Sequence, residues 1–146
     1  MKINIKILSE DAVVPTCGST FAAGSDLHAC IDNNGCIDIG PHETMMIGTG
    51  IAMEIPEGYV GLVFARSGLA CKNGLAPANK VGVIDSDYRG EIKVALHNHT
   101  DQNKKINHHD RVAQIVIVPY LSVEFNTVDE LSETLRNQGG FGSSGK

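Results

Sequence analysis

The stretch GVIDSDYRGEIKVAL (82–96) holds the residues with the clearest chemical potential. An apolar segment ends at Asp85, a polar turn follows, and a second apolar segment leaves that turn. A carboxylate fixed at the end of a strand can act as a general base toward a water molecule. Tyr88, in the turn, can pack against a sugar face, and Asn79, just upstream, can pair with the edge of a base. The simpler alternative for Asp85 is an acid that begins an ordinary hairpin turn.

A second polar group lies within FARSGLA (64–70). Arg66, Ser67 and Gly68 stand where a strand turns toward a possible short helix. Phosphate is bound both by the N–H groups at helix starts and by guanidinium groups. Taken alone, a capping serine beside a surface arginine explains the same pattern.

Two further segments place polar side chains beside apolar ones. In AAGSDLHA (22–29), Asp26 follows a turn of small residues. It either caps that turn or holds a metal-bound water or a neighbouring arginine. In RVAQIVIV (111–118), Arg111 and Gln114 begin an apolar strand. These two polar side chains either contact phosphate or water, or are polar because the strand lies at the edge of a sheet.

The C-terminal sequence GFGSSGK (140–146) approaches the Walker A pattern but lacks its final serine or threonine. We therefore do not predict a P-loop. Glycine-rich backbone with hydroxyl side chains can still wrap a phosphate chain, and Phe141 can stack on a base. The alternative is a disordered terminus with a single aromatic residue. We expect residues 137–146 to be mobile without ligand.

The elements that must position these residues are predicted to be short strands. Ile3, Ile5 and Ile7 alternate with polar residues, and apolar segments follow at 36–39, 43–55, 59–65, 80–85, 91–96 and 111–120. Glycine, proline, asparagine and aspartate separate these segments, which is typical of an all-β sandwich or barrel. Helical signals are limited to 67–76 and to a capping box beginning at Thr127, which predicts a turn or two within 127–136.

Composition narrows the class of protein. A chain of 146 residues fits one domain, and its net charge of −5 argues against a general nucleic-acid-binding surface. The four cysteines form no C-x-x-C pair, which favours a reducing cytoplasm. No apolar run is long enough to cross a membrane, and the N-terminus has the pattern of a strand rather than of a signal peptide. The histidines do not complete a zinc site.

Five segments together are more specific than any one of them. AAGSDLHA, RSGLA, NKVGVIDSDYRGEIKVAL, RVAQIVIVP and RNQGGFGSSG resemble, in order, the five motifs of the trimeric dUTPase family, and they span residues 22–145. The resemblance implies a β-jelly roll that assembles into a homotrimer, with three active sites at subunit interfaces. It also implies Mg²⁺-dependent hydrolysis of dUTP to dUMP and pyrophosphate, which keeps uracil out of DNA and supplies dUMP for thymidylate synthesis.

The resemblance assigns the hairpin to the nucleoside. It implies that Asp85 activates the attacking water at the α-phosphorus. Tyr88 packs under the deoxyribose, where a 2′-hydroxyl would clash, so UTP is excluded. Asn79 and the backbone of Val83, Ile84 and Asp85 contact the edge of uracil in a space too narrow for a 5-methyl group, so dTTP is excluded.

The remaining motif positions are implied to meet the phosphates and the metal. The phosphate-contacting positions are Arg66, Ser67, Gly68, Gln114, Arg136, Gly142 and Ser143. Lys93 lines the pocket, and Phe141 stacks over uracil when residues 137–146 close over the domain formed by residues 1–136. Asp26 acts through metal-bound water, while Mg²⁺ is held mainly by the substrate phosphates.

Two departures and two alternatives accompany this resemblance. Asn137-Gln138 stands where many relatives have smaller or acidic residues, and Ala22-Ala23 stands where a serine is common. Asn137-Gln138 is expected to change the closure of the C-terminal tail, and Ala22-Ala23 is expected to weaken a contact near Asp26. The alternative activities are deamination of dCTP on the same fold and a dUTP-responsive regulatory role. Tyr88 and the tail favour dUTP hydrolysis over deamination, and regulatory members usually carry an inserted segment.

Overall fold

Strands make up nearly all the regular structure of residues 1–140, the part of the chain that the computed structural model describes. They are β1 (Asn4–Ile7), β2 (Thr16–Cys17), β3 (Ser25–His28), β4 (Cys36–Ile39), β5 (Thr44–Gly48), β6 (Ile51–Glu54), β7 (Tyr59–Phe64), β8 (Leu75–Pro77), β9 (Gly82–Ile84), β10 (Lys93–Asn98), β11 (Lys104–Asn107) and β12 (Arg111–Pro119). The helical segments in this part are α1 (Ser67–Asn73) and a 3-10 turn at Asp32–Asn34. The predicted all-β class is confirmed.

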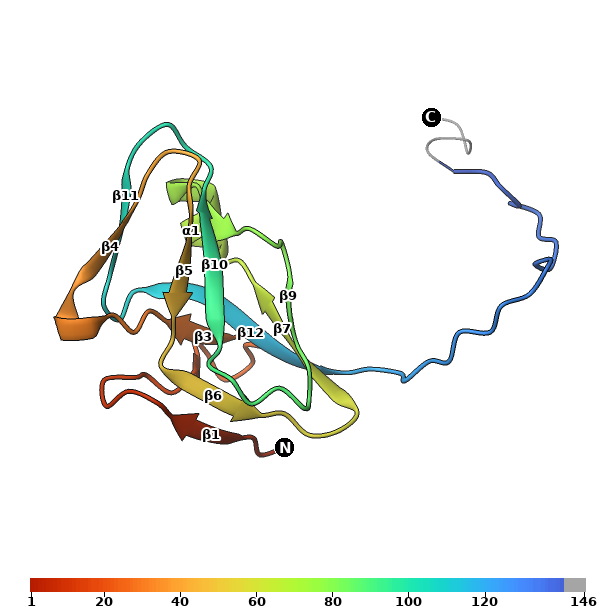
Figure 1. Ribbon diagram of the computed structural model, residues 1–146, viewed down its shortest axis with the longest axis horizontal. Coiled ribbons are helices and arrows are strands. Elements are labelled where there is room, and N and C mark those ends of the chain that lie inside the picture. Colours follow the sequence, from red (N-terminus) through yellow and green to blue (C-terminus); the bar gives the residue numbers. More distant parts are fainter. Residues whose placement is uncertain (141–146) are drawn as a thin grey trace.

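The strands form small antiparallel sheets (Figure 1). These sheets surround one apolar core. The largest sheet has the order β2-β3-β12-β7-β9, and a second has the order β5-β10-β8. β4 pairs with β11, and β1 pairs with β6. The alternation of residues along β10 explains how this strand contributes to the core. Val94, Leu96 and Asn98 are buried at every second position, whereas Lys93 is exposed. The fully buried aliphatic residues of the core include Leu27, Ile39, Ile47, Ile51, Ile92, Leu96, Ile106 and Val112.

The predicted hairpin over 80–96 differs from the observed pairing. Both strands form, but β9 pairs with β7, whereas β10 pairs with β5 and β8. The two strands therefore belong to different sheets and do not pair with each other. The hairpin is open, and this opening becomes part of the site described below.

The single strand predicted over 43–55 is two strands. β5 and β6 are separated at Thr49 and Gly50, where Gly50 has a φ of +66°. That backbone conformation favours glycine. A Cβ at Gly50 would also lie 2.8 Å from the Cys30 sulfur and 2.9 Å from the Ala12 Cβ. The break lets β5 join β10 while β6 joins β1.

Helix α1 lies inside the predicted range 67–76, and it ends at Gly74 in the left-handed conformation. The turn or two of helix predicted within 127–136 is absent, so that prediction is wrong. Leu131 and Leu135 are 87% and 112% exposed, so they pack against no surface formed by the described residues. A short amphipathic segment without tertiary packing is a marginal helix in water.

The segment after β12 extends away from the body as an arm, defined here as residues 120–140 (Figure 1). It carries exposed apolar side chains at Leu121, Val123, Phe125, Val128, Leu131 and Leu135. Exposed apolar side chains in such number are typical of a surface that contacts another chain.

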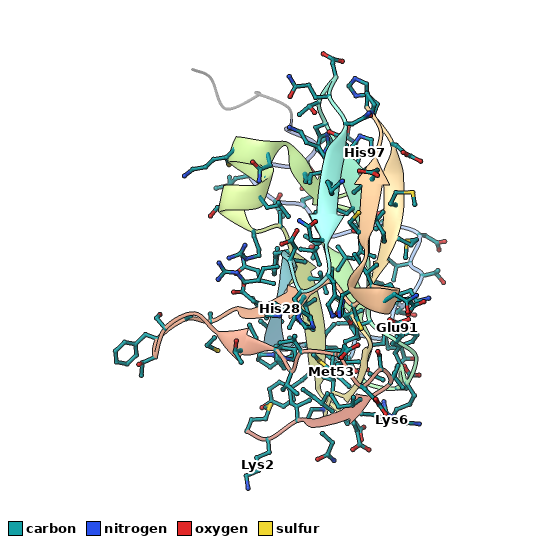
Figure 2. The ribbon with its side chains drawn as sticks, turned by 90° about the vertical axis from the view of Figure 1, so that its left-hand side faces the viewer. Lys2, Lys6, His28, Met53, Glu91 and His97 are labelled. Atoms are coloured by element: carbon teal, nitrogen blue, oxygen red, sulfur yellow. The ribbon has the colours of Figure 1, made fainter. Side chains whose placement is uncertain are left out.

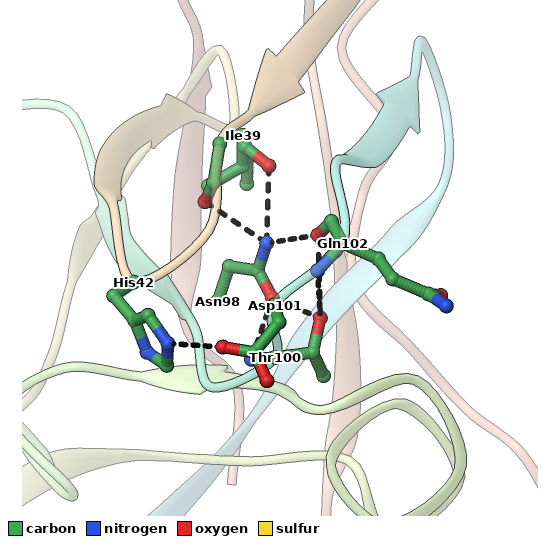
Figure 3. A network of polar contacts seen from close by, with 7 residues as sticks. Ile39, His42, Asn98, Thr100, Asp101 and Gln102 are labelled. Atoms are coloured by element: carbon green, nitrogen blue, oxygen red, sulfur yellow. Dashed lines mark hydrogen bonds and ion pairs between the residues drawn. The ribbon is translucent and has the colours of Figure 1, made fainter.

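A buried polar network ties two loops together at one end of the body (Figure 3). Asn98 is fully buried, and its amide nitrogen donates to the backbone oxygens of Ile39, Gly40 and Gln102 at 3.1, 2.9 and 2.7 Å. Its oxygen accepts from the N–H and hydroxyl of Thr100 at 3.0 and 2.8 Å. The side chain thereby supplies a donor to backbone oxygens at the end of β4, at Gly40 and at Gln102 in the turn before β11. Within residues 1–140 no helix is long and apolar enough to cross a membrane.

Candidate functional site

Asp26 on β3 connects two arginines from different parts of the chain. One carboxylate oxygen accepts from Nε of Arg66 at 2.8 Å, and the other accepts from Nη1 of Arg111 at 3.2 Å. The Asp26 side chain is only 16% exposed, so the Arg66 bond is partly shielded from water. The structure thus shows the arginine alternative for Asp26. A carboxylate oxygen can accept more than one hydrogen bond, so contact with a water remains open to it.

These side chains border a hollow of about 260 Å³, which we call the phosphate hollow. Its lining comprises Gly18, Ala22, Gly24, Asp26, Arg66, Ser67, Gly68, Arg111 and Gln114. Three separate sequence motifs therefore converge here, from β3 with its preceding loop, from the start of α1 and from β12. Ser67 and Gly68 are exposed in the first helical turn, where backbone N–H groups have no partner within a helix.

A β-bulge explains how β12 contributes two side chains to the same hollow. Arg111 and Gln114 are three residues apart, so in a regular strand they would face opposite sides. The register with β3 shifts between Arg111, which lies opposite His28, and Ala113, which lies opposite Leu27. An extra residue in a strand redirects the side chains that follow it. Both polar side chains consequently line the phosphate hollow.

Gln114 is held in place from two sides. Its Nε2 donates to the backbone oxygen of Ala65 at 2.9 Å, just before Arg66. On the other side, a Cβ added at Gly24 would lie 2.5 Å from its Oε1. Glycine at this position in the AAGSD segment thus makes room for the amide. The amide oxygen remains directed toward the glycine-lined side of the hollow.

The open hairpin forms a second hollow of about 250 Å³, which we call the nucleoside hollow. Its lining comprises Met46, Val83, Ile84, Asp85, Tyr88, Glu91 and Lys93. The hollow exists because β9 and β10 diverge into different sheets. Among residues 1–140, no hydrogen bond or ion pair engages the exposed Asp85 carboxylate. It is available to a bound molecule.

Tyr88 folds back over the turn. Its N–H donates to the Asp85 backbone oxygen at 3.2 Å, and its hydroxyl donates to the Glu91 backbone oxygen at 3.0 Å. Tyr88 is 44% exposed as a residue, so part of it can meet a ligand while its hydroxyl is bonded to the turn. Lys93 pairs with Glu91, with Nζ 3.3 Å from Oε2. A tyrosine fixed at both ends is a rigid wall rather than a mobile cover.

Asn79 lies beside the nucleoside hollow and not in its lining. It precedes a tight turn in which Val81 N–H donates to the Asn79 oxygen at 2.7 Å and Lys80 has a φ of +64°. Its Nδ2 lies 3.4 Å from the position that a Cβ on Gly82 would take. The amide thus reaches the start of β9.

No residue of the described range 1–140 lines both hollows. One chain therefore brings the predicted residues together in two sets, one at the phosphate hollow and one at the nucleoside hollow.

The remaining predicted residues lie toward the C-terminus. Arg136 lies in the arm, where its Nε donates to the Gly139 oxygen at 2.8 Å. The predictions for Phe141, Gly142 and Ser143 lie outside the described residues. The sequence analysis missed Glu91 and Met46 in the lining of the nucleoside hollow, since Glu91 gave only the signal of a charge at the start of a strand and Met46 only that of an apolar strand residue.

Metal-binding groups are sparse in the body. No set of three or more histidine, cysteine or acidic side chains in residues 1–140 could hold a metal ion.

Burial lowers the pKa of His28, an effect that Asp26 opposes and Arg111 reinforces. His28 lies opposite Arg111 at the edge of the phosphate hollow, and its Nδ1 has no partner within the same residues.

Comparison with known proteins places this geometry in a family. The dUTPase family model matches residues 10–145. The deoxyuridine 5′-triphosphate nucleotidohydrolase of Nautilia profundicola is 48% identical over 146 residues, covering 100% of both chains, and that of Escherichia phage T5 is 47% identical over 147 residues, covering 98% of both.

Solved structures agree with the sequence relatives. The dUTPase of Staphylococcus bacteriophage 80alpha with dUPNHPP superposes with a TM-score of 0.89 at 30% identity, covering 99% of both chains. A mutant dUTPase of phage phi11 of S. aureus, described for its coordination of a structural Mg(II) ion, has a TM-score of 0.81 at 28% identity, covering 91% of this chain and 100% of that one. The fold is therefore the jelly-roll-like fold of these enzymes, and the chain belongs to the dUTPase family.

Proposed function

We propose that this protein hydrolyses dUTP to dUMP and pyrophosphate. The observation that carries the proposal is the pair of hollows. In one, the Asp85 carboxylate, which has no partner in residues 1–140, lies beside Tyr88, and in the other Arg66 and Arg111 share Asp26. Uracil and deoxyribose occupy the nucleoside hollow, and the triphosphate meets the phosphate hollow. This activity keeps uracil out of DNA and supplies dUMP.

Each residue has a distinct part in the proposed reaction. Asp85 accepts a proton from a water whose oxygen attacks the α-phosphorus, and the bond from that phosphorus to the bridging oxygen breaks to release pyrophosphate. Tyr88 blocks a 2′-hydroxyl, and Asn79 with the backbone of Val83 and Ile84 contacts the uracil edge. Lys93 completes the wall of the nucleoside hollow.

The phosphate hollow supplies positive charge in a chain whose net charge is −5. Arg66, Ser67 and Gly68 contact the phosphates from the start of α1, and Gln114 contacts them from β12. Charge-assisted hydrogen bonds from arginine are well matched to phosphate oxygens. The arm adds Arg136, and the tail residues Phe141, Gly142 and Ser143 then cover uracil and phosphates as 137–146 closes over the domain of 1–136.

Mg²⁺ fits this site as an ion that arrives with the substrate. The body offers no cluster of metal ligands in its described part, whereas a triphosphate itself presents oxygen ligands to Mg²⁺. Asp26 is the acid in the phosphate hollow, and we propose that it contacts the ion through water while holding the arginines. The ion, when bound, would neutralise charge on the phosphates.

We also propose that the working unit is a homotrimer in the cytoplasm. The support is that the two hollows are separate within a chain and that an apolar arm leaves the body. Neighbouring copies can unite the hollows into three shared sites. Light scattering should give three times the 15.6 kDa mass of one chain, and a monomer with full activity would contradict sharing.

The proposed function is tested by measuring pyrophosphate release with Mg²⁺ from dUTP, dCTP, dTTP and UTP separately, with the product bases identified. Release from dUTP alone is expected. Uracil formed from dCTP would instead support deamination. Asp85→Asn should abolish turnover and keep dUTP binding, since the amide retains the shape but cannot take a proton. Loss of binding as well would contradict the role of Asp85.

A further inference from the structure

We infer that Glu91 is a positioning residue that fixes Tyr88 and thereby sets the discrimination between deoxyribose and ribose. This inference rests on the proposed function, because it needs dUTP as the substrate. Glu91 lies just before β10, at the end opposite His97 (Figure 2). It lines the nucleoside hollow together with Tyr88.

Glu91 both holds Tyr88 and is itself held. Its backbone oxygen accepts from the Tyr88 hydroxyl at 3.0 Å. Its side-chain Oε1 accepts from the Gly50 N–H at 2.9 Å, and Oε2 lies 3.3 Å from the Lys93 ammonium. The tyrosine is therefore fixed to a residue whose own place depends on a carboxylate bonded to the β5–β6 break.

The contacts around Thr49 and Gly50 fix the position of the break between β5 and β6. The Thr49 hydroxyl donates to the Ile92 oxygen at 2.6 Å, and the Ile92 N–H donates to the Ile51 oxygen at 2.9 Å. Thr49 is 1% exposed and Ile92 is fully buried. Ile92 is thus fixed by the core, and the Glu91 carboxylate extends this attachment by one residue toward the hollow.

Gly48 provides the space that Glu91 uses. A Cβ at Gly48 would lie 2.6 Å from Oε1 of Glu91, which is too close for both to keep their places. The clash would fall on the end of a flexible side chain rather than on backbone. Gly48→Ala therefore displaces the carboxylate without removing it, and it gives a second, independent perturbation of the same contact.

The consequence concerns which substrates are accepted. A wall that excludes a 2′-hydroxyl must be held to within a fraction of an ångström, because small misplacements at an active site have large kinetic effects. Without the carboxylate bond, the 88–91 turn relaxes and admits a ribose. Loss of stability alone would lower the rates for dUTP and UTP together, whereas loss of positioning changes their ratio.

The first experiment compares Glu91→Ala and Glu91→Gln by the ratio of kcat/KM for dUTP to that for UTP. Glu91→Ala should lower this ratio by roughly tenfold. Glu91→Gln should keep it, because the amide oxygen can still accept from Gly50. The matched control is Glu43→Ala, since Glu43 also accepts a glycine N–H, from Gly40 at 2.7 Å, but at the other end of β5. Its ratio should equal that of the unmodified protein.

A double-mutant cycle then tests the contact itself. Gly48→Ala should also lower the ratio, and adding it to Glu91→Ala should cause little further change, because the group that it displaces is gone. An unchanged ratio in Glu91→Ala, or additive effects in the double variant, would overturn the inference. Failure of the unmodified protein to release pyrophosphate from dUTP would instead contradict the proposed function.

Discussion

Replacing Asp26 by asparagine should weaken both the fold and the turnover of dUTP. The amide keeps the shape of the side chain, but only one of its two terminal atoms can accept a hydrogen bond. In the structure both oxygens accept, from Arg66 at 2.8 Å and from Arg111 at 3.2 Å. One arginine must therefore lose its partner and face an N–H group.

The two bonds contribute unequally. Arg66 is 25% exposed, so its bond is a partly shielded, charge-assisted one worth about 1.5–3 kcal/mol. Arg111 is 54% exposed, so its pair contributes about 0–1 kcal/mol. We expect a loss of about 2 kcal/mol in the free energy of unfolding, or roughly 6 °C in Tm. Loss of Arg66 orientation toward phosphate should lower kcat/KM roughly tenfold, which corresponds to about 1.4 kcal/mol.

The assay combines urea unfolding with steady-state kinetics at a series of Mg²⁺ concentrations. The matched control is Asp38→Asn, since Asp38 is 71% exposed and its pairing atom lies 3.9 Å from Lys105 Nζ. That variant should change stability by less than about 0.5 kcal/mol and leave turnover intact. Unchanged stability and turnover in Asp26→Asn would refute the reasoning. An increased Mg²⁺ requirement with unchanged stability would show that Asp26 acts on the ion rather than on the arginines.

Three further outcomes are expected. Asn98→Ala should cost about 3 kcal/mol in urea unfolding, because three backbone oxygens lose a buried donor; a cost below about 1 kcal/mol would contradict this. Burial lowers the pKa of His28 below 6.5, so the unfolded chain binds the proton more readily and stability should fall as pH drops through and below 6.5; His28→Gln should flatten this fall, and an unchanged slope would exclude His28 as its source. Deleting 137–146 should abolish most turnover while the melting curve stays unchanged, and full turnover would show that tail closure is dispensable.

The sequence predicted the class of fold because most strands are apolar runs bounded by turn residues. The strands that it did not predict lack that signal. β2 has two residues, β8 has three, and β11 (KKIN) contains one apolar residue, Ile106. These strands form where a neighbouring strand pairs with them, β3 for β2, β10 for β8 and β4 for β11, so they depend on tertiary context rather than on their own composition.

The pairing of the strands could not be predicted from the local sequence pattern either. Two apolar segments joined by a short polar turn predict a hairpin, yet β9 and β10 each gain more by pairing in separate sheets. The capping box at Thr127 predicted a helix that needs a partner surface, and the arm packs on no such surface in residues 1–140. Local signals specify what a segment can form, whereas its neighbours decide what it does form.

The site residues were easier to predict individually than in their contacts. The acid in AAGSD and the arginine in RSGLA are forty positions apart, and no spacing rule links them. The bulge that turns Arg111 toward the phosphate hollow leaves no mark in RVAQ. Glu91 looked like a surface charge because its partner is a backbone N–H on another part of the chain.

The separation of the two hollows has a genetic consequence. No residue among 1–140 lines both hollows, so of these two hollows Arg66→Ala changes the lining of the phosphate hollow and Asp85→Asn that of the nucleoside hollow. If each site unites hollows from different copies, trimers assembled at random from equal amounts of these two inactive chains would contain both intact hollows in about one site in four. Two alleles that are each null would then complement one another in the same cell, although neither produces a working enzyme alone.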